Sequence, residues 1–459
     1  MHTPEHARGV ATSAGRGSVW TPAQAERHLR SLELFGMRFG LDRMRRMMTV
    51  LDAPQRRLHA VHVLGTNGKS STTRMIAAIL ERHGVRTGSY TSPHLISDGE
   101  RLRIGERDVA PETFAAAIGR AVWAAERVDR TLDGDDHVTQ FELLTAAALS
   151  EMAEQEVRAA VVEAGLGGRY DATSVIEAPV TVLTNVALEH TRWLGPTVRD
   201  IAGEKLAVVH PEGTLVLGPW LDAEAVAVAE HVAGERGARI VWAGREDLGD
   251  GILGSVGCDR VTACPELRAR GLFQQRNFAL ARVAAEIWLR GAGIDLDERA
   301  VCDAARGIEV PGRMQLIGDD PPTVLDGAHN PHAVAALVES LPAVIGGRRP
   351  ALVMGVLEDK DAVSMLRTLL PLCERAWFTA PHSSRALPPA ALQSLARQLG
   401  FHAVACEPRP ERALAQARLW AREGSRAGRG EDARAVLATG SVYLVGELLH
   451  GLYLEGEAG

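Results

Sequence analysis

The fold is decided by residues 58–84, which read LHAVHVLGTNGKSSTTRMIAAILERHG. Apolar residues alternate from Leu58 to Leu64, and this pattern predicts a buried strand. A glycine loop follows, and apolar residues then recur at helical spacing until Gly84, a residue that typically ends a helix. The stretch therefore predicts a strand, a glycine loop and a helix in direct succession.

The loop itself predicts a phosphate site. Its sequence is Gly65-Thr66-Asn67-Gly68-Lys69-Ser70-Ser71. Backbone N–H groups of such a loop, placed at a helix N-terminus, converge on phosphate oxygens, and a lysine there reaches the outer phosphates. The Ser70 or Ser71 hydroxyl is positioned to bind Mg²⁺. The strict Walker pattern is broken because Val63 replaces its first glycine, so the alternative is an ordinary turn with a solvated lysine.

Alternating elements downstream predict a parallel sheet covered by helices. Helical patterns over residues 114–128, 141–153 and 201–209 separate most of the predicted strands, which are Ala159–Glu163, Val180–Thr184, Thr214–Leu217 and Arg239–Ala243. The pattern restarts near Pro311, with strands expected over residues 323–325, 351–356, 376–379, 403–406 and 435–438. We therefore expect a disordered extension over residues 1–18, a P-loop domain over 19–310, and a smaller Rossmann-like α/β domain over 311–459.

Composition argues for a soluble globular enzyme. The chain has 459 residues, 24% of them charged, and a formal net charge of -7, which disfavours general binding to nucleic acid or anionic membranes. No apolar run approaches the length of a transmembrane helix, and the first residues lack the apolar stretch of a signal peptide. We expect a cytoplasmic protein.

Further motifs appear in a fixed order along the chain. They are Thr91-Ser92-Pro93-His94-Leu95, Glu100-Arg101-Leu102-Arg103-Ile104, Thr139-Gln140-Phe141-Glu142, residues 163–173 (EAGLGGRYDAT), Leu188-Glu189-His190-Thr191, Glu204-Lys205, Pro311-Gly312-Arg313 and Asp326-Gly327-Ala328-His329-Asn330-Pro331. With the phosphate loop, this set resembles the Mur ligase superfamily and, within it, the folylpolyglutamate synthase/dihydrofolate synthase family. Ser70 departs from that pattern, since this family usually has glycine there.

The resemblance implies a set of nucleotide and metal ligands. ATP is expected on Thr66 to Ser71 and, from the other side, on Asn277, Arg313 and Asp326. Magnesium is expected on Ser71, Ser92, Glu163 and His190, with two ions bound. Glu163 also ends a predicted strand, the edge at which open α/β sheets bind ligands. The alternatives are a structural salt bridge for Glu163 and an ion pair between Arg313 and Asp326.

Catalytic and substrate residues are also implied by the resemblance. The catalytic candidates are Lys69, His190, Lys205 and Arg313, and Lys205 is a candidate for carbamylation by CO2. The expected substrate contacts are Met37, Arg38, Phe39, Thr139, Tyr170, Asp171, Ala172, His329 and Asn330. Met37 and Phe39 could equally belong to the core.

The implied reaction is an ATP- and Mg²⁺-dependent amide ligation. L-glutamate is joined to a folate through an acyl phosphate, and dihydropteroate is expected as a second acceptor. By the same resemblance we expect a monomer. The alternatives are a monofunctional folylpolyglutamate synthase, a Mur ligase acting on a UDP-sugar peptide, and a P-loop switch protein without ligase chemistry.

Overall fold

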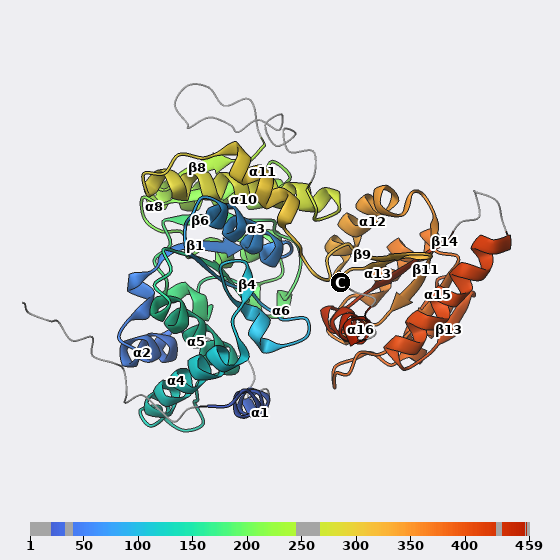
Figure 1. The fold of residues 1–459 in the computed structure, drawn as a ribbon, viewed down its shortest axis with the longest axis horizontal. Coiled ribbons are helices and arrows are strands. Elements are labelled where there is room, and N and C mark those ends of the chain that lie inside the picture. The colour runs from blue at the N-terminus through green and yellow to red at the C-terminus, as the bar shows by residue number, and fades with distance from the viewer. Residues whose placement is uncertain (1–19, 33–39, 245–266, 428–433, 455, 457–459) are drawn as a thin grey trace, which may run out of the picture.

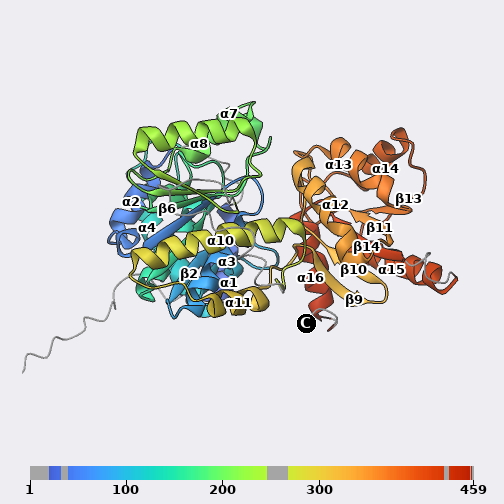
Figure 2. The same ribbon diagram turned by 90° about the horizontal axis from the view of Figure 1, so that it is seen from above.

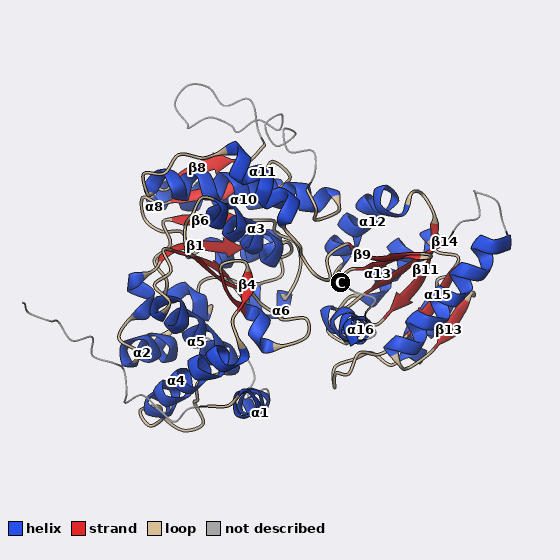
Figure 3. Cartoon of the chain, viewed as in Figure 1, coloured by secondary structure: helices blue, strands red, loops and turns tan. Residues whose placement is uncertain are grey.

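Two α/β units lie side by side in the computed structural model of the protein (Figure 1). The structure describes residues 20–32, 40–244, 267–427, 434–454 and 456. The predicted extension over residues 1–18 and the substrate candidates Met37, Arg38 and Phe39 lie outside the described residues. Helices cover both faces of each sheet (Figure 3).

The first unit is built on an eight-stranded sheet. In spatial order its strands are β4 (Arg107–Asp108), β3 (Leu102–Ile104), β2 (Thr87–Tyr90), β5 (Ala159–Glu163), β1 (His59–Leu64), β6 (Val180–Leu183), β7 (Thr214–Leu217) and β8 (Arg239–Trp242). Pairing is parallel from β2 to β8, whereas β3 and β4 are antiparallel to their neighbours. The phosphate loop therefore leaves the carboxyl end of a central strand.

Alternate residues of the central strands face two helical layers. Val61 and Val63 pack with one layer, formed by α3 (Lys69–Arg82), α10 (Leu272–Gly291) and α11 (Glu298–Gly307). The other face carries α1 (Pro22–Leu32), α2 (Asp42–Val50), α4 (Pro111–Asp129), α5 (Gln140–Glu154), α7 (Val198–Leu206) and α8 (Ala223–Arg236). A one-turn helix, α6 (Thr191–Leu194), follows His190.

The second unit has a six-stranded sheet. Its spatial order is β13 (Val404–Cys406), β12 (Arg375–Phe378), β11 (Arg349–Met354), β14 (Arg434–Thr439), β10 (Pro322–Leu325) and β9 (Gln315–Asp319), with only β9 antiparallel. One face packs against α12 (Pro331–Ile345), α13 (Ala362–Leu369) and α14 (Pro389–Gln398), and the other against α15 (Pro410–Ala427) and α16 (Val442–Leu454). Figure 2 shows the two units from above.

The parallel-rich α/β architecture predicted from the sequence is confirmed, and the exact domain division at residue 310 stays a prediction. Strands β2, β3, β4 and β9 were not predicted. β3 and β4 are too short for an alternation to be visible, and β2 reads Thr-Gly-Ser-Tyr, although all four residues are buried. None of the helices in the described part of the chain has the length and apolar character needed to cross a bilayer.

Gly446 of α16 offers a test of how the two units dock. A Cβ at this position would overlap the carbonyl oxygen of Leu95, which belongs to the first unit. Overpacking of this kind costs about 1–3 kcal/mol. We expect Gly446→Ala to lower the melting temperature and to speed hydrogen exchange over residues 92–95 and 442–449.

The matched control is Gly451→Ala on the same helix. There an added Cβ would make only an ordinary contact with the Cγ of Glu411, at 3.7 Å. Replacing a helical glycine by alanine without a clash should be neutral or stabilising by up to about 1 kcal/mol. Equal behaviour of the two variants would contradict the docking contact.

Candidate active site

The phosphate loop (residues 65–71) can adopt its shape because two of its residues lack a side chain. Gly65 and Gly68 have φ values of +144° and +82°, a range that favours glycine. A Cβ at Gly65 would collide with the hydroxyl of Thr184, and one at Gly68 with the side-chain oxygen of Asn277. Both glycines are therefore required by backbone conformation and by close approach.

The chain that follows β6 holds this loop in place. Thr184 donates from its hydroxyl to the carbonyl of Asn67 at 2.6 Å. The side chain of Asn185 accepts from the backbone N–H of Asn67 at 2.9 Å and donates to its carbonyl at 3.0 Å. The Thr66 hydroxyl accepts from the backbone N–H of Ala187 at 3.0 Å. Sequence reasoning missed Thr184 and Asn185, although Thr184 ends a predicted strand and Asn185 directly follows it.

Glu163 makes hydrogen bonds to two of the other residues predicted around the metal site. It ends β5, is 2% exposed, and accepts from the Ser70 hydroxyl and from the backbone N–H of Ser92, both at 3.0 Å. Burial raises the pKa of Glu163, although Lys69 and these hydrogen bonds oppose the rise. A cavity of about 260 Å³ lies beside the phosphate loop, and the buried Ser71 lines it together with Glu163 and Ser92. No described residue forms the structural salt bridge considered as the alternative for Glu163.

The second unit closes the other side of the cavity. Arg313, Asp326 and His329 line it opposite the phosphate loop. The two carboxylate oxygens of Asp326 accept from the backbone N–H groups of Met314 and Ala328, both at 2.8 Å. No ion pair joins Arg313 to Asp326 among the described residues, so the guanidinium faces the cavity without that partner. Groups predicted for ATP therefore meet from both units.

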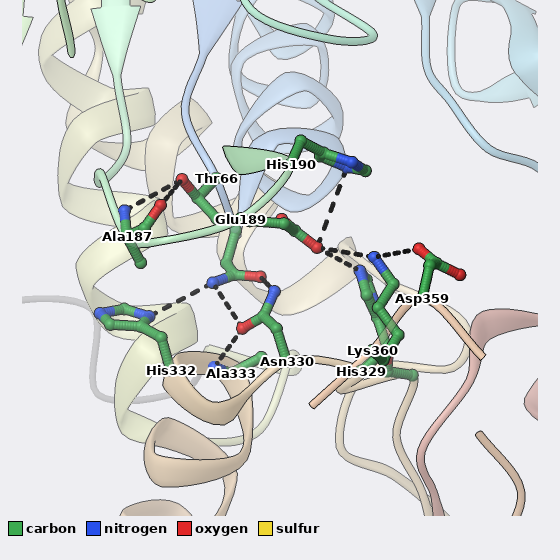
Figure 4. Close-up of polar contacts among 12 residues, drawn as sticks. Thr66, Ala187, Glu189, His190, His329, Asn330, His332, Ala333, Asp359 and Lys360 are labelled. Carbon is green, nitrogen blue, oxygen red and sulfur yellow. Dashed lines mark hydrogen bonds and ion pairs between the residues drawn. The ribbon is translucent and has the colours of Figure 1, made fainter. Parts of the chain in front are cut away.

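Several polar contacts join the units beside this cavity (Figure 4). Asn67 and Asn330 exchange side-chain hydrogen bonds at 2.9 and 3.3 Å. One carboxylate oxygen of Glu189 lies 3.0 Å from the Nζ of Lys360 and 3.3 Å from the Nε2 of His329. Burial opposes ionisation, but His329 and Lys360 hold the pKa of Glu189 well below its usual range. Glu189 and Lys360 were not among the predicted site residues.

Lys205 and His190 lie near the loop in different settings. Lys205 does not line the cavity; it is 4% exposed, and its Nζ donates to the carbonyl of Gly65 at 2.9 Å. Burial and the charge of Lys69 lower the pKa of Lys205 to about 7. His190 lines the cavity, and burial lowers its pKa to about 4, so the imidazole is neutral at physiological pH. Both side chains are therefore available in uncharged form.

Asn277 is oriented by a residue that sequence reasoning did not find. Its side-chain N–H₂ donates to the side-chain oxygen of Gln274 at 3.0 Å, and its own oxygen faces Gly68. Gln274 is fully buried in the first turn of α10, which begins five residues before the predicted helix start at Asn277. The Gln274 contact therefore fixes the orientation of the Asn277 amide, whose contact with a nucleotide stays a prediction.

The remaining substrate candidates lie on the first unit, outside the cavity. The Thr139 hydroxyl caps α5 and is bonded to Glu142, and the Asp171 carboxylate accepts from the backbone N–H groups of Leu166 and Thr173. Ala172 is buried, whereas Tyr170 is half exposed. Thr139 and Asp171 thus use their side chains to stabilise their own segments, and Tyr170 is exposed beside Asp171. Their contact with substrate stays a prediction.

This geometry agrees with the known proteins that the chain resembles. The pattern of the Mur ligase middle domain matches residues 63–248, and that of the Mur ligase glutamate ligase domain matches residues 312–442. The dihydrofolate synthase/folylpolyglutamate synthase of Bacillus subtilis is 32% identical over 357 residues, covering 75% of this chain and 82% of the relative. The chain belongs to the dihydrofolate synthase/folylpolyglutamate synthase family. It is therefore an ATP-dependent ligase.

Two solved structures extend the family relationship across nearly the whole chain. The folylpolyglutamate synthase of Mycobacterium tuberculosis complexed with ADP has a TM-score of 0.82 at 28% identity, covering 93% of this chain and 97% of that one. The bifunctional enzyme of Yersinia pestis complexed with AMPPNP and a Mn ion has a TM-score of 0.76 at 27% identity, with 94% and 98% covered.

The site residues fit a divalent cation with few protein ligands. In the described ranges no group of three or more His, Cys, Asp or Glu side chains is arranged to hold a metal ion by itself. Mg²⁺ keeps several waters and needs only one or two carboxylates together with phosphate oxygens. Glu163 with the serine hydroxyls beside it supplies that donor set.

Glu163→Gln tests this assignment. The amide keeps the size of the side chain but removes the negative charge, so the Mg²⁺ concentration needed for half-maximal ADP formation should rise at least tenfold. Glu374→Gln, which changes a carboxylate paired with Arg434 in the second unit, should leave the Mg²⁺ titration unchanged. An unaltered titration in Glu163→Gln would return Glu163 to a structural role.

Proposed function

We propose that this enzyme uses ATP to join L-glutamate to the γ-carboxylate of tetrahydrofolates and, as a second activity, to dihydropteroate. The observation that supports this proposal is one cavity, lined by the phosphate loop of the first unit and by Arg313, Asp326 and His329 of the second. Family membership supplies the substrate class, since the Bacillus subtilis relative is named for both activities.

The chemistry requires an activated carboxylate. A carboxylate does not react with an amine at neutral pH, because oxide would have to leave. Transfer of the γ-phosphoryl group from ATP releases ADP and gives an acyl phosphate. The glutamate amine then attacks the acyl carbon, loses a proton, and phosphate leaves as the amide forms.

Lys69 and Arg313 approach the transferring phosphoryl group from opposite units. Charges fixed in advance stabilise the negative charge of that group without reorganisation. The contacts between Asn67 and Asn330, and between Glu189 and Lys360, hold the units together around the reacting atoms. Such closure also keeps water from hydrolysing the acyl phosphate. His329, which lines the cavity beside Lys360, is placed for the anionic amino-acid substrate.

Two Mg²⁺ ions belong to the proposal. The Ser70 or Ser71 hydroxyl would hold one, and His190 together with Glu163, Ser92 and a carbamylated Lys205 would hold the other. When bound, these ions neutralise phosphate charge and polarise the phosphoryl oxygens. We further propose that the enzyme is monomeric and cytoplasmic, and that Tyr170, Thr139, Asp171 and Ala172, with residues 37–39, form the pterin side of the substrate site.

The function is tested by ADP release with each acceptor in turn. Wild-type enzyme should release ADP with glutamate plus tetrahydrofolate and with glutamate plus dihydropteroate, and not with a UDP-sugar peptide. Lys69→Ala should lose about 10²–10³-fold in kcat, as expected for removing one preorganised electrostatic contact. Activity on tetrahydrofolate alone would reject the second activity, and near-normal turnover of Lys69→Ala would reject the phosphate-loop role.

Lys205 is tested by chemical rescue. A pKa near 7 leaves much of the amine unprotonated and able to add to CO2, and the carbamate would present oxygen ligands. Lys205→Ala should therefore lose most activity and regain part of it with formate or acetate. Lys69→Ala is the matched control, because it lacks a cation and should gain nothing from a carboxylate. A fully active Lys205→Ala enzyme would refute the role.

A further inference from the structure

A second cavity lies further along α3 than the site described above. It has a volume of about 260 Å³ and shares no lining residue with the ATP cavity. Its wall comes from α3, from the hairpin of β3 and β4, and from the linker (residues 307–311) that follows α11. The chain leaves α11 beside α3 and continues into the second unit (Figures 1 and 2). We call this second cavity the linker cavity.

Most charges in the wall of the linker cavity are paired. Arg103 lies 3.0 Å from the carboxylate of Asp108, and Glu106 accepts two hydrogen bonds from Arg82 at 2.8 and 3.0 Å. Glu309 forms an ion pair with Arg268. Each carboxylate of the wall thus has an arginine partner, although Arg82 and Arg268 do not themselves line the cavity.

Arg74 is the exception. It lines the cavity from α3, and within the described ranges it makes no hydrogen bond and no ion pair. Burial and the charge of Arg103 lower the pKa of Arg74 to about 10, although Asp108 and Glu100 act against the shift. A partly buried guanidinium without a partner is costly, because desolvation is not offset by a direct counter-ion.

The other residues of the wall indicate which class of ligand could bind Arg74. A guanidinium presents a planar fork that matches a carboxylate. The side chains of Ala77, Ala78 and Ile308 add an apolar surface next to it. The carboxylates of Glu106, Asp108 and Glu309 line the same cavity and would repel a doubly charged phosphate more than a single carboxylate.

We propose that the linker cavity is a second ligand site, which takes a small aliphatic carboxylate on Arg74. The carboxylate pairs with the guanidinium, and the short hydrocarbon part packs on the apolar wall. The ligand touches both α3, which begins at the phosphate loop, and the linker that continues to Arg313. Occupancy therefore ties together two elements that reach the ATP cavity.

Propionate is the probe for this site. Saturation-transfer NMR with enzyme kept saturated with Mg²⁺ and ADP should show binding to wild-type protein. Arg74→Met keeps the length of the side chain but removes the charge, and should weaken propionate binding roughly tenfold or more. The matched control is Arg290→Met, which changes an arginine paired with Glu286 on α10, away from the cavity wall, and should bind propionate as wild type does. Equal binding to Arg74→Met and wild type would overturn the proposal.

A second variant covers the case in which Arg74→Met does not fold. Ala77→Leu keeps Arg74 and places three more carbon atoms against the cavity, so it should reduce propionate binding to a similar degree. Unchanged binding in Ala77→Leu would count against the site. Inorganic phosphate should compete with propionate only weakly, and stronger binding of phosphate than of propionate would show that the ligand class is wrong. None of these residues belongs to the proposed ligase machinery, so failure here leaves the proposed function untouched.

Discussion

The hydrogen bonds between the end of β6 and the phosphate loop are the constraint on which the rest of the structure depends. Thr184 and Asn185 hold the backbone of Asn67 through its N–H and its carbonyl. With its backbone fixed in this way, the Asn67 side chain turns outward to Asn330 of the second unit. The loop proposed to bind phosphate thus also contacts the second unit, so nucleotide binding and domain docking would involve the same short segment.

Docking also assembles groups that neither unit could supply alone. Lys69 belongs to one unit, and Arg313 and Asp326 belong to the other, so their convergence exists only while the units are in contact. Polar contacts hold them together with two apolar ones, the packing of Phe273 against the core of the second unit and the close approach of α16 to Leu95. Interfaces of this kind permit relative domain motion, which suits an enzyme that must admit three substrates and then exclude water.

Burial sets the protonation of the groups around the loop. It raises the pKa of Glu163 and lowers those of His190 and Lys205, and each shift favours the neutral form. Glu189 behaves differently because His329 and Lys360 contact it directly. These neutral forms suit the proposed metal site. A bound magnesium ion would favour the ionised form of Glu163. An uncharged Lys205 amine could react with CO2, whereas a protonated Lys205 would repel the metal ion.

The sequence by itself determined the strand, loop and helix at residues 58–84 and most of the parallel strands. Those features follow from local periodicity and from glycine and lysine at fixed spacing, which are visible within one stretch of chain. Only the tertiary structure decided that Ser70 contacts Glu163, that Gln274 orients Asn277, and that Asn67 pairs with Asn330 across 263 residues. The tertiary structure also decided the strands β3 and β4. They have only three and two residues, too few to show an alternating pattern, and they form because they pair with neighbouring strands. The physical reason is the same throughout: a side chain's partner is set by which elements pack together, and packing depends on the whole chain.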